Sequence, residues 1–67
     1  MLKLSKRKIL IILAERGLSL RQLAQMLGMT DYSFQHILFC KPNQRRRIVR
    51  KVATILGVTI EEIIGDE

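Results

Sequence analysis

The sequence has few of the cysteine and histidine residues from which metal sites and many catalytic sites are built. Its 67 residues include one cysteine, Cys40, and one histidine, His36, and contain no tryptophan. A single cysteine excludes an internal disulfide, and the two residues provide no metal-ligand spacing. We therefore expect no metal ion and no cofactor, and a reducing, cytoplasmic setting.

Catalytic patterns are missing as well. No nucleophile and base stand at a plausible spacing, and no glycine-rich phosphate loop is present. Glu61 and Glu62 are adjacent, so on a helix they point apart. A domain this small buries only about 60% of the surface that its unfolded chain exposes, which leaves little room for a deep cleft. The sequence predicts one domain over residues 1–67, not an enzyme, with no catalytic residues and no small-molecule ligand.

Long hydrophobic runs are also absent. Lys3, Lys6, Arg7 and Lys8 before the apolar run 9–14 resemble the start of a signal peptide, but this run is short and Glu15 follows it. Nothing approaches the eighteen or so apolar residues that a membrane span requires. We interpret the run as part of a helix and expect no membrane association.

Acidic residues are few and unevenly placed. Twelve Lys and Arg face six Asp and Glu, and residues 59–67 contain four of the acids and none of the bases. A net charge of +6 on so small a domain favours a polyanionic partner, although a merely solvated basic surface is the alternative. With 48% hydrophobic residues the chain is too apolar to be a disordered basic tail.

Helix signals fill the chain, with almost no strand signal. Ser19 with Gln22 and Thr59 with Glu62 form capping-box patterns, and Ser5 and Thr30 are suited to be N-caps. All four glycines stand where helices should end: Gly17, Gly28, Gly57 and Gly65. The predicted fold is all-α, with five helices at about 5–16, 19–27, 30–39, 44–56 and 59–64.

Helical spacing then predicts the core. The expected inward faces are Leu20, Leu23, Ala24 and Leu27; Phe34, Ile37 and Leu38; Ile48, Val52, Ile55 and Leu56; and Ile60, Ile63 and Ile64. In the first helix Ile9, Leu10, Ile12 and Leu13 can face the core, while Ile11 points away, either as a lone exposed residue or as part of a dimer surface. A turn of about 100° per residue places Tyr32, Gln35, His36 and Phe39 opposite the apolar side of the third helix. Such side chains are unusual for a purely solvated face, which more often carries Lys and Glu.

Residues 19–38 have the pattern of a helix-turn-helix. A steep crossing of two short helices needs a small residue, Ala24, and a turn residue, Gly28, together with apolar anchors. Those anchors are present at Leu23, Leu27, Met29, Phe34 and Ile37. An ordinary helical hairpin in a bundle is the alternative.

The sequence resembles the Cro/C1-type (XRE-type) helix-turn-helix repressors of phages and bacteria, and in particular their small, single-domain Cro-like members. The similarity covers LRQLAQMLGMTDYSFQHIL, the basic stretch KPNQRRRI and the closing stretch ATILGVTIEEIIGD. It implies a compact five-helix, lambda-repressor-like fold that binds a palindromic double-stranded DNA operator as a homodimer. It also implies that the third helix enters the major groove, in the cytoplasm of a prokaryotic cell or a phage-infected host.

The resemblance also assigns base-reading positions. They fall on Asp31, Tyr32 and His36, with Thr30 and Gln35 as neighbours. His36 or Gln35 can hydrogen-bond purine edges, Tyr32 can meet a phosphate or a thymine methyl, and Asp31 can accept from cytosine N4. For Asp31 the helix dipole alone is a sufficient explanation.

Several positions depart from the family pattern. Leu20 replaces a Gln that commonly braces a phosphate contact, and Leu13 with Leu38 replace an ion pair found in some members. Cys40 replaces a frequent Gly. Phe39 stands where a polar residue is common, and either folds over the fourth helix or contacts DNA.

The stretch CKPNQRRRIVRK holds half of the basic residues of the chain. Arginines at the start of a helix are unfavourable, because the helix dipole is positive there. A bound phosphate would offset this cost, so the pattern favours a phosphate-binding cluster, or clamp. We predict that Arg50 and Lys51 are solvated and that Ile48 and Val52 anchor the fourth helix. The predicted clamp is Lys41, Asn43, Gln44, Arg45, Arg46 and Arg47.

Two functions remain open. The first is sequence-specific DNA binding by a small transcriptional regulator, most simply a repressor. The second is a protein-interaction module or antitoxin-like adaptor that uses Tyr32, His36 and Phe39. A steep loss of affinity with salt distinguishes phosphate contacts from an aromatic protein interface.

Overall fold

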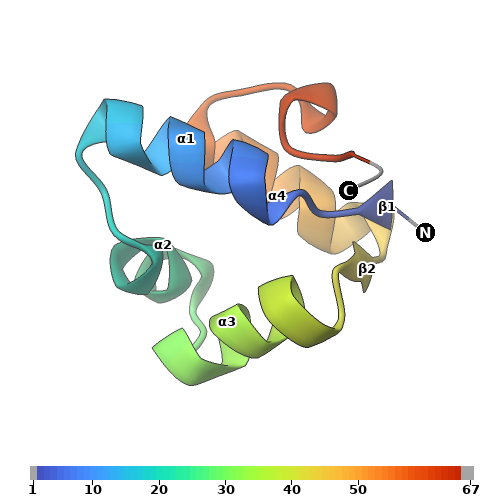
Figure 1. Ribbon diagram of the computed structural model, residues 1–67, viewed down its shortest axis with the longest axis horizontal. Helices are drawn as coiled ribbons and strands as arrows, with labels where there is room; N and C mark the ends of the chain where they lie inside the picture. Colours follow the sequence, from blue (N-terminus) through green and yellow to red (C-terminus); the bar gives the residue numbers. More distant parts are fainter. Residues whose placement is uncertain (1, 66–67) are drawn as a thin grey trace.

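The computed structural model describes residues 2–65. In this range the chain forms four α-helices, one turn of 3-10 helix and one pair of two-residue strands (Figure 1). The elements, in chain order, are β1 Leu2–Lys3, α1 Lys6–Arg16, α2 Leu20–Leu27, α3 Asp31–Cys40, β2 Asn43–Gln44, α4 Arg46–Leu56 and the 3-10 turn η1 Ile60–Glu62.

The helical fold is confirmed, with two corrections to the predicted elements. The fifth helix is only the turn η1, too short to make α-helical hydrogen bonds along its length. The fourth helix begins at Arg46 rather than at residue 44, because Asn43 and Gln44 are extended in β2. Asp66 and Glu67, at the predicted acidic end, lie outside the described residues.

Local capping signals set the helix starts as predicted. The Ser5 and Thr30 side chains accept from the N–H groups of Lys8 and Ser33, at 3.2 and 3.1 Å. Ser19 and Gln22 form a complete capping box, in which the Ser19 Oγ accepts from the Gln22 N–H and the Gln22 Oε1 accepts from the Ser19 N–H. At Thr59 the Glu62 carboxylate accepts from the Thr59 N–H at 2.8 Å, while the Glu62 N–H donates to the Thr59 backbone carbonyl.

Three glycines end helices in the left-handed conformation, as predicted: Gly17, Gly28 and Gly57. Gly28 matters most for the site, because its φ of 77° makes the turn between α2 and α3. Gly65 does not have this role. The turn η1 already ends at Ile63, and the N–H of Gly65 donates to the Lys3 carbonyl.

The core is one cluster of side chains to which all four α-helices contribute, together with Leu4 and Ile63. Ala24 is fully buried in α2, which packs against α3. Within residues 2–65, the buried hydrophobic residues are Leu4, Ile9, Ile12, Leu13, Leu23, Ala24, Leu27, Phe34, Leu38, Val49, Val52, Ala53, Leu56 and Ile63.

Part of the predicted core was wrong in detail. On α4 the buried stripe contains Val49 and Ala53, whereas Ile48 and Ile55 are half-buried. Both stripes are apolar, and the one with smaller side chains lets α4 approach the core more closely. Leu10 is 40% exposed, while Ile11 points outward as predicted.

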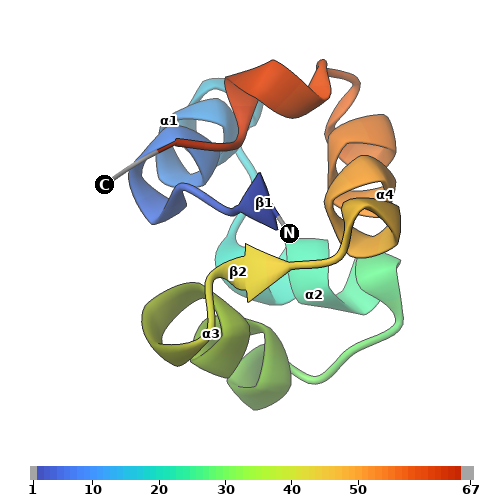
Figure 2. The ribbon, with the colours of Figure 1, turned by 90° about the vertical axis from the view of Figure 1, so that its right-hand side faces the viewer.

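The strand pair was not predicted. β1 and β2 are antiparallel, with Leu2 opposite Gln44 and Lys3 opposite Asn43 (Figure 2). The Leu4 N–H then donates to the Pro42 carbonyl at 2.8 Å, and Leu4 forms a bridge with Ile64. The N-terminal segment 2–5 therefore fastens the loop between α3 and α4 to the rest of the fold.

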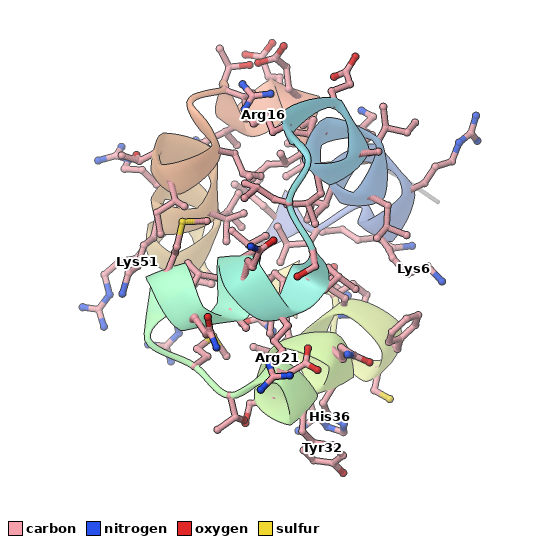
Figure 3. The ribbon with its side chains drawn as sticks, turned by 90° about the vertical axis from the view of Figure 1, so that its left-hand side faces the viewer. Lys6, Arg16, Arg21, Tyr32, His36 and Lys51 are labelled. Atoms are coloured by element: carbon pink, nitrogen blue, oxygen red, sulfur yellow. The ribbon has the colours of Figure 1, made fainter. Side chains whose placement is uncertain are left out.

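The α3 helix lies at the lower edge of the molecule in Figure 1, and Figure 3 shows α2 between it and the helices α1 and α4. This placement leaves one side of α3 open to solvent. None of the helices in residues 2–65 is long and apolar enough to cross a membrane.

Candidate nucleic-acid interface

The open side of α3 is set by the residues that anchor its other side. Phe34 and Leu38 are buried, at 1% and 4% exposure, and hold the helix on the core. Tyr32 is 80% exposed, and Figure 3 shows Tyr32 and His36 pointing away from the molecule. The predicted outward face of α3 therefore exists.

Two pairs of side chains, each one helical turn apart, organise this face. The rings of Tyr32 and His36 stack with centroids 6.3 Å apart and planes 19° apart. Along one side of the face, the Gln35 Nε2 donates to the Asp31 Oδ1 at 2.9 Å. Side chains at this spacing are neighbours on a helix, and their contacts restrict the rotamers available to each. Four predicted base-reading residues are thus held in a defined arrangement.

Thr30, Asp31 and Gln35 are less accessible to a partner than Tyr32. The Thr30 hydroxyl accepts from the Ser33 N–H and donates to the Ser33 Oγ, so it is engaged at the start of the helix. Asp31 and Gln35 are half-buried, in contrast to the exposed Tyr32. Both still reach the edge of the open face.

Arg21, which the sequence pattern did not single out, lies near this face. It is exposed in the first turn of α2, which carries no acid, and Figure 3 shows it directed toward the side of α3. A base at this place again opposes the helix dipole. That opposition is the signal by which the sequence could have identified it.

The predicted clamp residues lie in the loop after α3 and in the first turn of α4, which begins at Arg46. They surround an open hollow of about 630 Å³, and Arg46 is the one clamp residue that does not line it. The hollow is lined by Cys40, Lys41, Pro42, Asn43, Gln44, Arg45, Arg47 and Ile48. Because three of these lining residues are basic, Lys41, Arg45 and Arg47, and none of the described ones is acidic, the hollow can hold an anion.

Within the loop, Gln44 and Arg45 have distinct roles. The Gln44 Nε2 donates to the Lys41 carbonyl at 2.7 Å and so closes the loop on itself. Arg45 is the N-cap of α4 but makes no side-chain capping hydrogen bond, and the first turn of α4 contains no acid. The N–H groups at this helix start and the arginine side chains are therefore suited to the same anion.

Lys51, a neighbour of the clamp, is placed differently from its prediction, and for Phe39 one of the two alternatives is excluded. Arg50 is exposed, but the Lys51 Nζ donates to the Leu27 carbonyl at 3.2 Å. The Lys51 ammonium group therefore interacts with the negative end of the α2 dipole and is not simply solvated. Phe39 does not fold over α4; it is 54% exposed, with the Lys6 Nζ of α1 4.3 Å from its ring centroid.

A comparison with known families agrees with this geometry. The sequence model of the Cro/C1-type HTH DNA-binding domain matches residues 8–67. No curated protein and no solved structure matches the chain. The match covers almost the whole chain, and the family consists of DNA-binding regulators and not of enzymes. The chain therefore belongs to the Cro/C1-type helix-turn-helix DNA-binding domain family.

Proposed function

We propose that this DNA-binding regulator is a repressor that recognises a palindromic operator, with α3 in the major groove. The open face of α3, carrying two ordered side-chain pairs beside a basic loop, is the observation that supports this function. An α-helix fits the major groove, where every base pair presents a distinct pattern of donors and acceptors. A repressor then acts by occupying the promoter.

Sequence choice belongs to α3 in this proposal. With its Oδ1 held by Gln35, Asp31 keeps Oδ2 as an acceptor for cytosine N4. The stacked ring of Tyr32 holds His36 toward a purine edge and itself meets a thymine methyl or a phosphate. Thr30 contributes at the helix start, where its hydroxyl oxygen lies beside Ser33.

Affinity and register belong to the loop. Lys41, Arg45, Arg46 and Arg47 provide the positive charge, and the exposed Asn43 provides a neutral donor. Gln44 uses one amide hydrogen within the loop and retains the second for a phosphate oxygen. These contacts carry no base information, because all nucleotides share the same phosphate.

Dimerisation follows from size. A single small domain buries little DNA surface, whereas two copies that read half-sites about one helical turn apart bury twice as much. We propose that the dimer contact lies on the side of α4 and η1, which Figure 2 shows away from α3. We also propose that residues 1–67 act as one domain in the cytoplasm of a prokaryotic cell.

Selection from a random duplex library tests this function. Enrichment of a two-fold symmetric motif, followed by anisotropy titration of that motif at several salt concentrations, is the expected result. Affinity should fall steeply with salt, by about 0.9 log units per log unit of salt for each phosphate contacted. A library without an enriched motif contradicts the proposal.

Sedimentation on a half-site and on a full site tests the dimer. We expect one copy on the half-site and two on the full site. A single copy at saturation of the full site contradicts the proposed symmetry.

The alternative function is a protein-interaction module or antitoxin-like adaptor. Tyr32 and Phe39, at 80% and 54% exposure, are the observation that favours it. Binding through these aromatic side chains should respond weakly to salt. A salt-insensitive complex with a protein and no enriched DNA motif would support this alternative.

A further inference from the structure

The open face of α3 extends to Phe39, and from there onto α1. Tyr32, His36 and Phe39 follow each other at spacings of four and three residues, so they form one stripe along the helix. At the end of this stripe the Lys6 Nζ lies 4.3 Å from the Phe39 ring centroid. Such a cation–π contact holds a flexible ammonium group in place. A positive charge from α1 is therefore fixed at the C-terminal end of the proposed DNA-reading face.

Further basic residues surround this point. Lys3, Lys6 and Arg7 line an open hollow of about 350 Å³ together with Phe39 and Pro42, and among residues 2–65 no acid lines it. Pro42 also lines the first hollow, at the loop between α3 and α4, so the two basic surfaces adjoin. Positive potential thus continues from the loop across the end of α3 to α1.

The first turn of α1 has the same unusual charge pattern as that of α4. It carries Lys6, Arg7 and Lys8 and no acid, against the preference set by the helix dipole. Lys8 is already engaged, because its Nζ donates to the Ile64 carbonyl at 2.6 Å. The exposed Lys6 and Arg7 are left to face an anion from outside.

We propose that Lys6, positioned by Phe39 and assisted by Arg7 and Lys3, forms a second phosphate-binding surface for duplex DNA. This inference rests on the proposed function. The surface contacts the DNA backbone just outside the bases read by α3, on the side of the helix C-terminus. It adds affinity and salt dependence without base preference.

Lys6→Ala and its matched control Arg16→Ala test the surface. Figure 3 shows Lys6 and Arg16 at opposite ends of α1, with Lys6 on the side of α3. Binding is measured by anisotropy at several salt concentrations, on the selected operator with flanking base pairs and on a version trimmed to the bases read by α3.

Lys6→Ala should lower the salt slope on the extended operator by about 0.9, the value for one lost phosphate contact. On the trimmed operator the change should be much smaller. Lys6→Arg should retain the wild-type slope, because a guanidinium also stacks on an aromatic ring and binds phosphate. Arg16→Ala should change neither duplex.

Phe39→Leu tests the positioning role. It should weaken binding to the extended operator in the presence of Lys6 and have little effect in the Lys6→Ala background. Additive losses would show that Phe39 acts independently of Lys6 and would overturn its proposed role.

An unchanged salt slope for Lys6→Ala, or an altered base preference, would overturn the surface itself. Thermal melting identifies any variant that fails to fold, and Lys6→Gln then replaces Lys6→Ala. The two proposals fail separately. If the wild-type chain binds no DNA, the proposed function is wrong; if it binds and Arg45→Ala lowers the slope while Lys6→Ala does not, only this surface is wrong.

Discussion

The side-chain amide of Gln35 donates a hydrogen bond of 2.9 Å to the Asp31 carboxylate, across one turn of α3. This contact fixes the direction of the Asp31 side chain at the start of α3. It also leaves the second carboxylate oxygen as a directed acceptor. Gln35 thereby becomes a positioning residue, and the two side chains should act as one unit.

Asp31→Asn and Gln35→Ala should therefore affect the same base pair of the operator. Loss of a good base contact costs about 1–3 kcal/mol of discrimination. In the double variant the losses should not add, and a coupling of about 0.5–3 kcal/mol is typical of residues in contact. Competition binding against operators substituted at each position measures this.

The exposed Gln25 of α2 provides the control. Gln25→Ala should leave all base preferences unchanged. If Asp31 and Gln35 variants relax preference at different base pairs, the two residues read DNA independently and the pairing has no role in recognition.

His36→Ala should change base preference at one or two neighbouring base pairs without destabilising the domain, because His36 is exposed. Tyr32→Ala removes the stacked ring and should relax preference at the same positions, whereas Tyr32→Phe preserves the stack. Selection from a randomised half-site measures each preference. An unchanged preference for His36→Ala would remove this residue from the reading face.

Arg45→Ala and Arg47→Ala should weaken binding to all DNA sequences about equally. Each removes one phosphate contact and should lower the salt slope by about one. Arg50→Ala, an exposed change on the same helix, is the control and should have little effect. A shift in base preference for either loop variant would contradict the division of roles between the loop and α3.

Ser19→Ala should lower stability by about 1 kcal/mol, because it removes the oxygen that accepts from the Gln22 N–H in the capping box. In a domain of this size that loss corresponds to a decrease of about 4–8 °C in Tm. Thr54→Ala, at an exposed position of α4, should be neutral or slightly stabilising since alanine favours helix. Equal Tm values for Ser19→Ala and the wild type would contradict the capping role.

The features predicted correctly from the sequence depend on neighbours along the chain. Ser19 and Gln22 are three residues apart, and Gly28 acts through its own backbone conformation. By contrast, two-residue strands have no periodicity, so the pairing of Leu2 with Gln44 has no local signal. On α4 the sequence could not show whether Val49 and Ala53 or Ile48 and Ile55 face the core, because both pairs are apolar and only the packed neighbours distinguish them.

The same distinction applies to the site. Helical geometry placed Tyr32 and His36 on one outward face, and the spacing of Asp31 and Gln35 permits their contact. The contact of Lys6 with Phe39 joins two helices that are distant in sequence. The same holds for Lys51, whose partner is the Leu27 carbonyl. Such partners are determined by the tertiary fold.

The attachment of the N-terminal segment to the loop has a consequence for regulation of affinity. A pair of two-residue strands can open locally at a lower free energy than the whole domain. When residues 2–3 detach from Asn43 and Gln44, the loop loses the strand pairing, and the bond from the Leu4 N–H to the Pro42 carbonyl is the backbone contact that still joins it to the N-terminal segment. The measured DNA affinity is then scaled by the attached fraction of molecules. Changes at Leu2, which lies in β1 and not in α3, should therefore alter occupancy of the proposed operator.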